Sequence, residues 1–361
     1  MRKLFFLFAT VLASAITASA EDYGIKVAGV TVTDKNYTNI TGDKITAYNA
    51  DESCSVTYDR VRKILTLKNV KIDRSGSYNR AIINTGCDGL TIVFDGKNYL
   101  KADDAAPVRL EKNTTIKCTN VKGYNGVQLV GGDEDVIYLT GGVSLTFDNA
   151  ALLINSESSH GIVGNKGNDK VYVRNSTVVV NCKETDYYTM KDLALLDVDN
   201  STVRLLTNIN TRPVVSNITF LTRADGMQIL PWTMVALNSG RPVKFSTEKK
   251  TFVYEDDESQ VSCKVTLTKA VPVSKENFPD DNFRAFVRKL VVCIDSFLVT
   301  ENPLGISGGS FGDPMPFDET KDIEEMVLTD KNISSLKGIE YFTHLKRLFC
   351  DQNNLSQIDV S

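Results

Sequence analysis

The chain has 361 residues, a formal net charge of −4 at pH 7 and 42% hydrophobic residues. It is mildly acidic and has no basic cluster, so nucleic acid and anionic membrane surfaces are not expected partners. Its seven cysteines are an odd number at uneven spacing, and its two histidines lie far apart. We therefore expect neither a disulfide framework nor a zinc site, no metal or other cofactor, and mostly buried thiols.

The first twenty residues have the features of a secretory signal peptide. Arg2 and Lys3 precede an apolar run over residues 4–16, and the small residues Ala18-Ser19-Ala20 lie before the expected cleavage point. The apolar run is too short to span a bilayer, and no later stretch is long and apolar enough to do so. We therefore predict a bacterial protein that is exported to the cell surface or the medium, with residues 1–20 as its signal peptide.

Residues 21–268 are predicted to form one domain of stacked β repeats. Three similar segments begin at Leu145, Val171 and Leu196, at steps of 26 and 25 residues. In each segment apolar and polar residues alternate, a polar break follows, and the alternation resumes. Alternation with a period of two on both sides of a break predicts a strand, a corner and a second strand. Such a unit buries its apolar face only by stacking on the next unit, which predicts a parallel β-solenoid.

The break contains the same residue type in all three segments, at Asn149, Asn175 and Asn200. Asparagine tolerates left-handed backbone, and its amide can bond to an equivalent residue in the next turn. We interpret these residues as a structural asparagine ladder, with a ligand site as the alternative. Before the repeats, residues 23–46 alternate in a way that predicts a β-rich N-terminal cap.

The pattern changes near residue 271. Phe283, Phe286 and Val287 have helical spacing, and the acidic residues before them suit a helix start. The stretch 299–320 is rich in Gly, Pro and Asp without a strong period, and is predicted to be a loop. We therefore assign residues 269–320 to a helical cap followed by a loop.

Residues 321–361 contain the beginning of a second repeat, with a step of 22 residues. The pattern Ile323-x-x-Met326-x-Leu328 returns as Leu345-x-x-Leu348-x-Cys350. This spacing is typical of leucine-rich repeats, and we expect Asn332 and Asn354 to turn inward and satisfy backbone groups. Only about two repeats fit before the sequence stops, so we interpret this part as a truncated leucine-rich segment.

These motifs resemble a family of bacterial exported proteins that combine a carbohydrate-binding-type β-helix with leucine-rich repeats. The segments that carry the resemblance are 56–72, 89–92, 112–116, 277–283 and 333–342. The resemblance implies an all-β fold: a right-handed parallel β-helix with an N-terminal β cap, then a short leucine-rich-repeat segment with a helical N-cap. It implies no catalytic residues. The calcium loop sometimes found in such proteins is not expected, because residues 291–312 lack the D-x-D-x-D-G spacing.

Some β-helix proteins degrade polysaccharides, and paired carboxylates on an outward column would indicate such chemistry. Asp148, Arg174 and Asp199 are predicted to share one column, with the two carboxylates roughly 10 Å apart. The arginine between them would lower the pKa of both, whereas a general acid must stay protonated. We interpret the column as charge pairing between turns and His160 as a solvated turn residue, and we assign no catalytic residue.

Binding is the class of function that the sequence favours. A solenoid presents long, flat faces, and aromatic rings on such faces can stack on sugars. Tyr172, Tyr187, Tyr188 and Trp232 are the candidate binding residues, with ordinary surface aromatics as the alternative interpretation. We expect a non-catalytic, adhesin-like protein that binds a glycan or a host or partner protein. A polysaccharide lyase or glycoside hydrolase of the β-helix type is the alternative.

Overall fold

The computed structural model describes residues 20–356 apart from several gaps. These are residues 77, 122, 166, 185, 208–211, 223–226, 232–242, 255–256, 263, 273–274, 276, 288–313 and 317–322. The predicted signal peptide, up to residue 19, and Trp232 therefore lie outside the described residues. Within the described part of the chain, no helix has the length and apolar character needed to cross a membrane.

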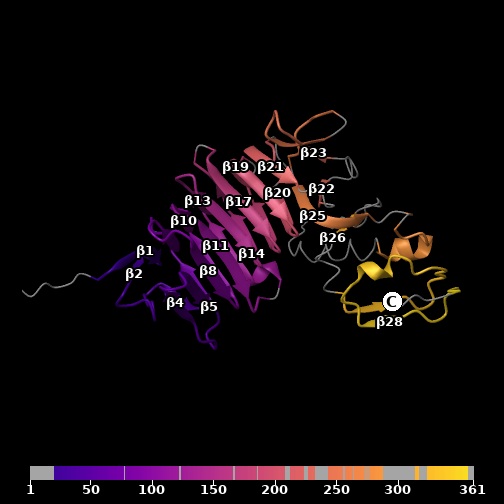
Figure 1. Ribbon diagram of the computed structural model, residues 1–361, viewed down its shortest axis with the longest axis horizontal. Helices are drawn as coiled ribbons and strands as arrows, with labels where there is room; N and C mark the ends of the chain where they lie inside the picture. The colour runs from indigo at the N-terminus through magenta and orange to yellow at the C-terminus, as the bar shows by residue number, and fades with distance from the viewer. Residues whose placement is uncertain are drawn as a thin grey trace, which may run out of the picture.

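The larger part of the described chain is a β-solenoid of about eight turns, which confirms the predicted repeat architecture (Figure 1). Each turn passes through three faces, which we call faces one, two and three. Face one contains β5 (Ile64–Lys68), β8 (Leu90–Asp95), β11 (Thr114–Thr119), β14 (Ser144–Asp148), β17 (Asp169–Arg174) and the end of β19 (Met190–Asp199). Face two contains β6 (Val70–Asp73), β9 (Asn98–Ala102), β12 (Val127–Gly131), β15 (Ala151–Ser156), β18 (Thr177–Cys182) and β20 (Thr202–Thr207).

Face three is the narrowest, because most of its strands have two or three residues. It contains β7 (Ile82–Asn84), β10 (Val108–Leu110), β13 (Ile137–Leu139), β16 (Ile162–Val163), the start of β19 and the start of β21 (Val215–Thr222). We call the connection from face one to face two corner one, that from face two to face three corner two, and the last corner three. β19 runs through corner three without a break, so it pairs with both β16 and β17. Faces one and three therefore belong to one 14-stranded sheet.

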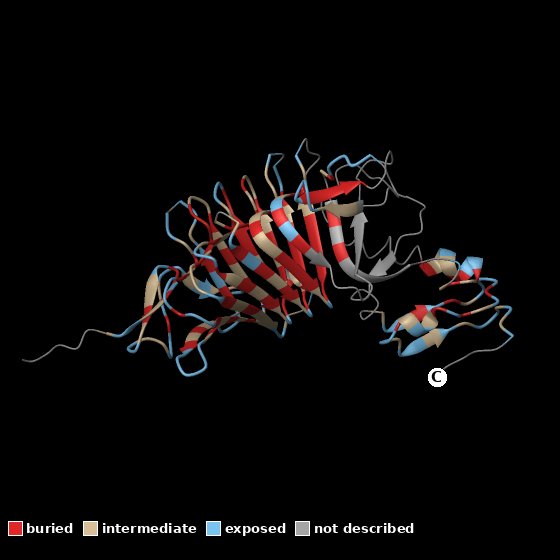
Figure 2. Cartoon of the chain, turned by 45° about the horizontal axis from the view of Figure 1, so that its top comes forward, coloured by how far each residue is buried: buried red, intermediate tan, exposed pale blue. Residues whose placement is uncertain are grey.

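Strands of successive turns pair in parallel, in the register that the repeat spacing predicts. Leu145 pairs with Val171, and Val171 pairs with Leu196. All three side chains are fully buried. Figure 2 shows the same alternation across the solenoid, where buried residues alternate with more exposed ones along the strands. Equivalent residues thus stack on one another at the strand spacing of about 4.8 Å.

The inward residues of the three faces form one continuous hydrophobic core. This core includes residues from Ile25 to Leu267, with Phe94 and Phe147 among its largest fully buried side chains. Burial of each such side chain stabilises the fold by about 1.5–3 kcal/mol. Of the five cysteines that the structure describes, all are free, and Cys87 and Cys182 are buried.

Both ends of the solenoid depart from parallel pairing. Four strands pair antiparallel at the N-terminal end: β1 (Asp22–Val27), β2 (Val30–Thr33), β3 (Ile45–Ala47) and β4 (Ser55–Asp59). At the other end β25 (Lys264–Pro272) pairs antiparallel with β20 and with β22 (Met227–Pro231). β23 (Val243–Ser246) and β24 (Thr251–Tyr254) form a separate hairpin. The prediction of stacked parallel repeats over residues 21–268 did not include this reversal of direction.

One part of the predicted loop over 299–320 is a strand instead. β26 (Pro314–Pro316) pairs antiparallel with the end of β25, at Ala270–Pro272. A strand of three residues that begins and ends with proline shows no alternation, so the sequence pattern could not indicate it. The neighbouring residues 288–313 and 317–322 lie outside the described part of the chain.

A second, smaller hydrophobic core lies in residues 277–356, which we call the C-terminal region. Its buried residues include Phe278, Phe283 and Leu328. A helix covers residues 281–287, and the Asp280 carboxylate accepts the N–H groups of Asn282 and Phe283 at its start, at 2.9 and 2.8 Å. The same carboxylate accepts the N–H and hydroxyl of Ser334, which joins the helix to the segment that follows.

The C-terminal region also contains two parallel strands, β27 (Glu325–Val327) and β28 (Arg347–Phe349), with turns between them that include η2 (Ile339–Tyr341). Met326 pairs with Leu348, which is the predicted step of 22 residues. The prediction for the inward asparagine was wrong. Asn354 is exposed, whereas Asn353 donates to the carbonyls of Leu328 and Cys350 and accepts two N–H groups. Asn332, predicted to be its equivalent one repeat earlier, is also exposed. For Asn354 the error is one position, because Asn353 and Asn354 are adjacent and fit the spacing almost equally well.

Candidate functional site

The charged column on face one is already occupied by contacts within the protein. Asp148 pairs with Arg174 and Arg174 with Asp199 in the strand register, as predicted. The ion pairs differ from the prediction: Arg174 Nη2 lies 2.5 Å from Asp197 Oδ2, and Asp148 Oδ2 lies 2.6 Å from the Nζ of a lysine on β11, Lys117. Asp197 lies on the next turn, beside Tyr172, so the Arg174 side chain extends diagonally toward it. Its guanidinium lies 5.3 Å from the ring centroid of Tyr172.

This arrangement gives face one little that could act on a ligand. The predicted binding residue Tyr172 is half-buried, and the Arg174 guanidinium beside it is held in an ion pair with the buried Asp197. The carboxylate of Asp148 is already engaged in an ion pair with the Lys117 ammonium group of the neighbouring turn. The face is therefore best explained as a surface that ion pairs between neighbouring turns hold together.

At corner one, the predicted asparagine ladder residues all have left-handed backbone. The φ angles of Asn149, Asn175 and Asn200 are 51°, 49° and 47°. Asn200 Nδ2 donates to Asn175 Oδ1 at 2.7 Å, so these two turns are joined directly. The amide of Asn149 donates instead to the carboxylate of its neighbour Asp148, at 2.9 Å. These amides therefore bond to residues of the solenoid and help to hold its turns together.

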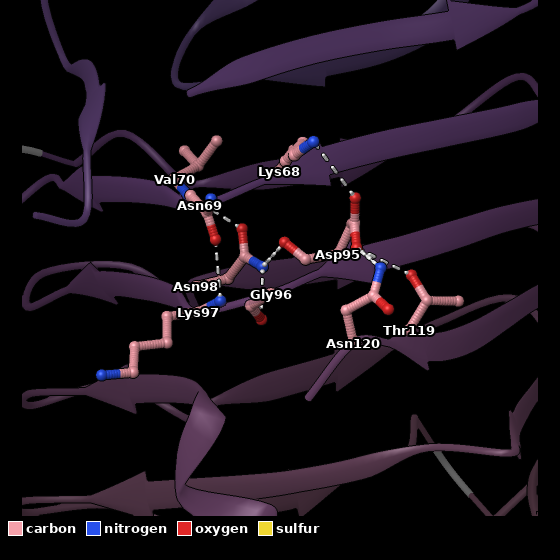
Figure 3. Close-up of polar contacts among 9 residues, drawn as sticks. All are labelled: Lys68, Asn69, Val70, Asp95, Gly96, Lys97, Asn98, Thr119 and Asn120. Carbon is pink, nitrogen blue, oxygen red and sulfur yellow. Dashed lines mark hydrogen bonds and ion pairs between the residues drawn. The ribbon is translucent and has the colours of Figure 1, made fainter. Parts of the chain in front are cut away.

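Earlier turns use the same corner in a related way (Figure 3). Asn98, which is fully buried, accepts the N–H of Val70 at 3.0 Å and donates to the carbonyl of Asp95 at 3.1 Å. The Asp95 carboxylate in turn accepts the amide of Asn120 at 2.6 Å. Asn69 also has left-handed backbone, with φ at 50°. Corner one is thus a column of polar side chains that satisfy backbone and one another.

One connection at corner one is longer than the others. The connection between β11 and β12 spans residues 120–126 and contains the short helix η1 (Tyr124–Gly126), whereas two residues suffice at Asn149 and Ala150. An open cavity of about 310 Å³ lies beside it, lined in part by Asn120, Asn149 and Cys118. Burial raises the pKa of the Cys118 thiol to about 11, which makes this thiol a poor nucleophile at neutral pH.

Corner two brings two of the predicted binding residues together with a histidine. The His160 ring stacks on Tyr188 with centroids 5.3 Å apart and meets the edge of Tyr187 at 5.2 Å. His160 Nδ1 accepts the backbone N–H of Tyr188 at 2.8 Å. The expectation of a solvated turn residue was therefore wrong, because the ring fills the space between two successive turns.

The surroundings of this cluster fix its charge state. Burial, with a smaller contribution from Lys191, lowers the pKa of His160 to about 4, so the ring is neutral at pH 7. The ammonium of Lys191 lies 6.0 Å from the Tyr188 ring centroid. Asp135, in the previous turn, has its pKa raised by burial, and its carboxylate accepts the hydroxyl of Ser159 at 2.9 Å. The cluster thus presents a tyrosine face beside a cation, over neutral and hydrogen-bonded groups.

Face three extends this cluster into a row that sequence reasoning missed. The outward residues of its successive strands are Lys26, Ile83, Arg109, Tyr138, Val163, Lys191 and Ser216, aligned by strand pairing. The guanidinium of Arg109 lies 5.9 Å from the Tyr138 ring centroid. The row therefore contains three cations, no carboxylate and one aromatic ring, with Tyr188 beside Lys191.

We call face three together with the adjoining part of corner two the basic-aromatic strip, with Arg109, Tyr138, Tyr188 and Lys191 as its main residues. Sequence analysis found Tyr188 but not the others. A strand of two or three residues has only one outward position, so no alternation marks it. The structure also separates Tyr172, on face one, from Tyr187 and Tyr188, so the predicted residues do not form one site.

Nothing in the described part of the chain groups three or more His, Cys, Asp or Glu side chains in a way that could hold a metal ion. No family model matches the sequence, and no curated protein or solved structure matches it significantly.

Proposed function

We propose that this chain is a non-catalytic binding protein that recognises a glycan through the basic-aromatic strip. The observation that carries the proposal is the repeated pairing of a ring with a cation: Arg109 beside Tyr138, and Lys191 beside Tyr188. Sugar rings stack on tyrosine faces, while cations and hydroxyl groups nearby supply hydrogen bonds that fix their orientation.

The spacing of the solenoid supports a polymer as the ligand. Outward residues on face three recur at about 4.8 Å per turn, which is comparable to the length of one sugar residue in an extended chain. The pairing of strands places Arg109, Tyr138 and Lys191 in one row across successive turns, so an extended ligand could contact several of them at once. Many weak contacts in series give binding through multivalency without a deep pocket.

Three finer features of the molecule are proposals of the same kind. We propose that the solenoid is right-handed, since parallel strands joined by crossover connections nearly always are. The step of 22 residues and the inward Asn353 support the interpretation of the C-terminal region as leucine-rich repeats, which commonly bind proteins. The apolar run and small residues at the N-terminus support export, and therefore a role at the cell surface or outside the cell.

A glycan array followed by titration tests the proposed function. Tyr138→Ala and Tyr188→Ala should each weaken binding about tenfold, as expected for the loss of a central aromatic contact. Tyr172→Ala is the matched control, because Tyr172 also lies beside an arginine but on face one. Equal losses in all three variants, or no glycan bound by the intact chain, would contradict the proposal. Release of new reducing ends from a bound polysaccharide would show a glycan-degrading enzyme instead.

A further inference from the structure

Two arginines from neighbouring turns lie together near the N-terminal end of face three. Arg109 is the outward residue of β10. Arg80 precedes β7 in the adjacent turn, where Ala81 and Ile82 both donate to the carbonyl of Pro107. The position that corresponds to Arg80 in the next turn is Ala106, a small and buried residue. The fold therefore places two guanidinium groups on one part of the basic-aromatic strip.

The protein leaves these two groups incompletely satisfied. Arg109 forms an ion pair with Glu111, with Nη2 and Oε1 at 2.7 Å, but its buried Nε has no hydrogen-bond partner. The Nε of Arg80 likewise has none. Within the described residues, no carboxylate lies within 4.0 Å of the Arg80 guanidinium. An arginine that is half-buried without a carboxylate in contact is unusual, because its charge loses hydration with only partial compensation.

The electrostatics of the pair agree with this geometry. Burial lowers the pKa of Arg80, and repulsion from Arg109 lowers it further, although Glu134 and Glu111 partly offset the effect. The two like charges therefore repel one another across neighbouring turns, and an anion bound by both would relieve this repulsion. Guanidinium groups bind carboxylate, sulfate and phosphate oxyanions through paired N–H donors.

We propose that Arg80 and Arg109 bind an oxyanion carried by the glycan, so that the ligand is an acidic polysaccharide with carboxylate or sulfate groups. This inference rests on the proposed function and narrows its substrate class. Two aromatic residues favour an anion attached to a sugar over a free anion. The Tyr138 ring lies beside Arg109, and Tyr78, two residues before Arg80, is 84% exposed at corner two.

The test compares charged polysaccharides with neutral counterparts of the same backbone, using the full chain. Polygalacturonate is paired with methyl-esterified polygalacturonate, and dextran sulfate is paired with dextran. We expect the acidic member of at least one pair to bind about tenfold tighter or more, and the binding to weaken as salt is raised. The pair of polymers that shows this difference in affinity identifies carboxylate or sulfate as the recognised group.

Variants assign the effect to the two arginines. Arg80→Gln and Arg109→Gln should each remove about tenfold of the preference for the acidic polymer, and Arg80→Lys should restore part of it, because a lysine keeps the charge without the paired donors. Lys170→Gln is the control for net charge, since Lys170 is an exposed, outward residue of face one. An unchanged melting temperature in each variant would show that the fold is intact.

Three results would overturn the proposal in distinguishable ways. Equal binding of neutral and acidic polymers, with no effect of Arg80→Gln, would leave a neutral glycan as the ligand and the proposed function intact. Equal losses in Lys170→Gln and Arg80→Gln would show diffuse attraction to the whole surface. Binding of no polysaccharide at all, including the neutral ones, would contradict the proposed function as well.

Discussion

The solenoid and the C-terminal region both stack parallel strands at a constant step, and asparagine holds the turns in both. Asn98 of the solenoid is buried and bonds to backbone groups, as Asn353 does, but the recurrent corner asparagines of the solenoid face outward. In the solenoid, Asn175 and Asn200 lie at an outer corner and bond to one another. In the C-terminal region, Asn353 turns inward and satisfies four backbone groups of two turns. The difference shows that the position of an asparagine within a repeat decides its role, and that its mere recurrence does not.

The two regions also differ in how completely their strands are covered. Solenoid strands such as β14 have a neighbour on each side and a fully buried inner face. β27 and β28 pair only with one another among the described strands, and their outward residues Val327 and Phe349 are 52% and 46% exposed. Stability in the C-terminal region therefore depends more heavily on a few polar contacts, which predicts a different response to substitution.

The largest expected effect is that of Asn353→Ala. The variant loses the bonds to Leu328 and Cys350 and leaves two N–H groups without their acceptor, which should lower the local free energy of unfolding by about 3 kcal/mol. Hydrogen–deuterium exchange of β27 and β28 measures this loss, and exchange in the solenoid should be unchanged. Asn354→Ala is the control and should have little effect; a comparable loss there would mean that the inward residue is misassigned.

A smaller effect is expected at the solenoid corner. Asn175→Ala should destabilise the chain by about 1–2 kcal/mol, because alanine is strained at a φ of 49° and cannot bond to Asn200. Asn175→Gly should recover most of this loss, since glycine adopts left-handed backbone freely. Urea denaturation followed by circular dichroism measures both. The control is Asn181→Ala, which removes the side-chain bond from Asn181 on β18 to Asn155 on β15 without involving left-handed backbone. A glycine variant as unstable as the alanine variant would argue against backbone strain.

The smallest expected effect is that of pH, and the pH range in which stability is lost differs between the two regions. His160 is neutral in the folded chain with a pKa of about 4, whereas an unfolded histidine takes up a proton near pH 6.5. Acid therefore favours the unfolded state between pH 6.5 and pH 4. The full shift corresponds to about 3 kcal/mol, and the partial exposure of the ring reduces the expected loss to on the order of 1 kcal/mol. His160→Gln should flatten this dependence in urea titrations. An unaltered slope would mean that His160 does not cause it.

In the C-terminal region the sign is opposite. Burial alone would raise the pKa of Asp280, but hydrogen bonds from Ser334, Phe283 and Asn282 outweigh it and lower the pKa. The contribution of Asp280 to stability is therefore complete above its unfolded pKa of about 3.9 and is lost only below it. Protection from hydrogen exchange in the C-terminal region should consequently stay constant between pH 6.5 and pH 4, the range in which the solenoid loses stability.

The sequence predicted the parts of the fold in which side chains alternate over enough residues to show a period. Faces one and two have strands of about five residues, so the alternation by itself aligned Leu145, Val171 and Leu196 correctly. The left-handed corner at Asn175 followed from the chemistry of that residue. These features depend on local sequence alone.

The parts that could not be predicted depend on contacts between distant turns. Arg109 and Tyr138 are 29 positions apart and lie on strands of three residues, so only the stacking of turns brings them together. His160 looks like a turn residue in sequence, and its burial comes from Tyr187 and Tyr188 in the next turn. The antiparallel pairing of β25 with β20 likewise depends on tertiary packing, and no local sequence pattern indicates it.

The seven-residue connection between β11 and β12 has a consequence for how such a protein can evolve. β12 still pairs in register with β9 before it and β15 after it, although the neighbouring connections at this corner, from β8 to β9 and from β14 to β15, need only two residues each. The pairing of these strands therefore does not depend on the length of the connection at this corner. The length and sequence of such a connection can therefore change by insertion and deletion while the hydrophobic interior stays constant, much as variable loops change on a conserved framework.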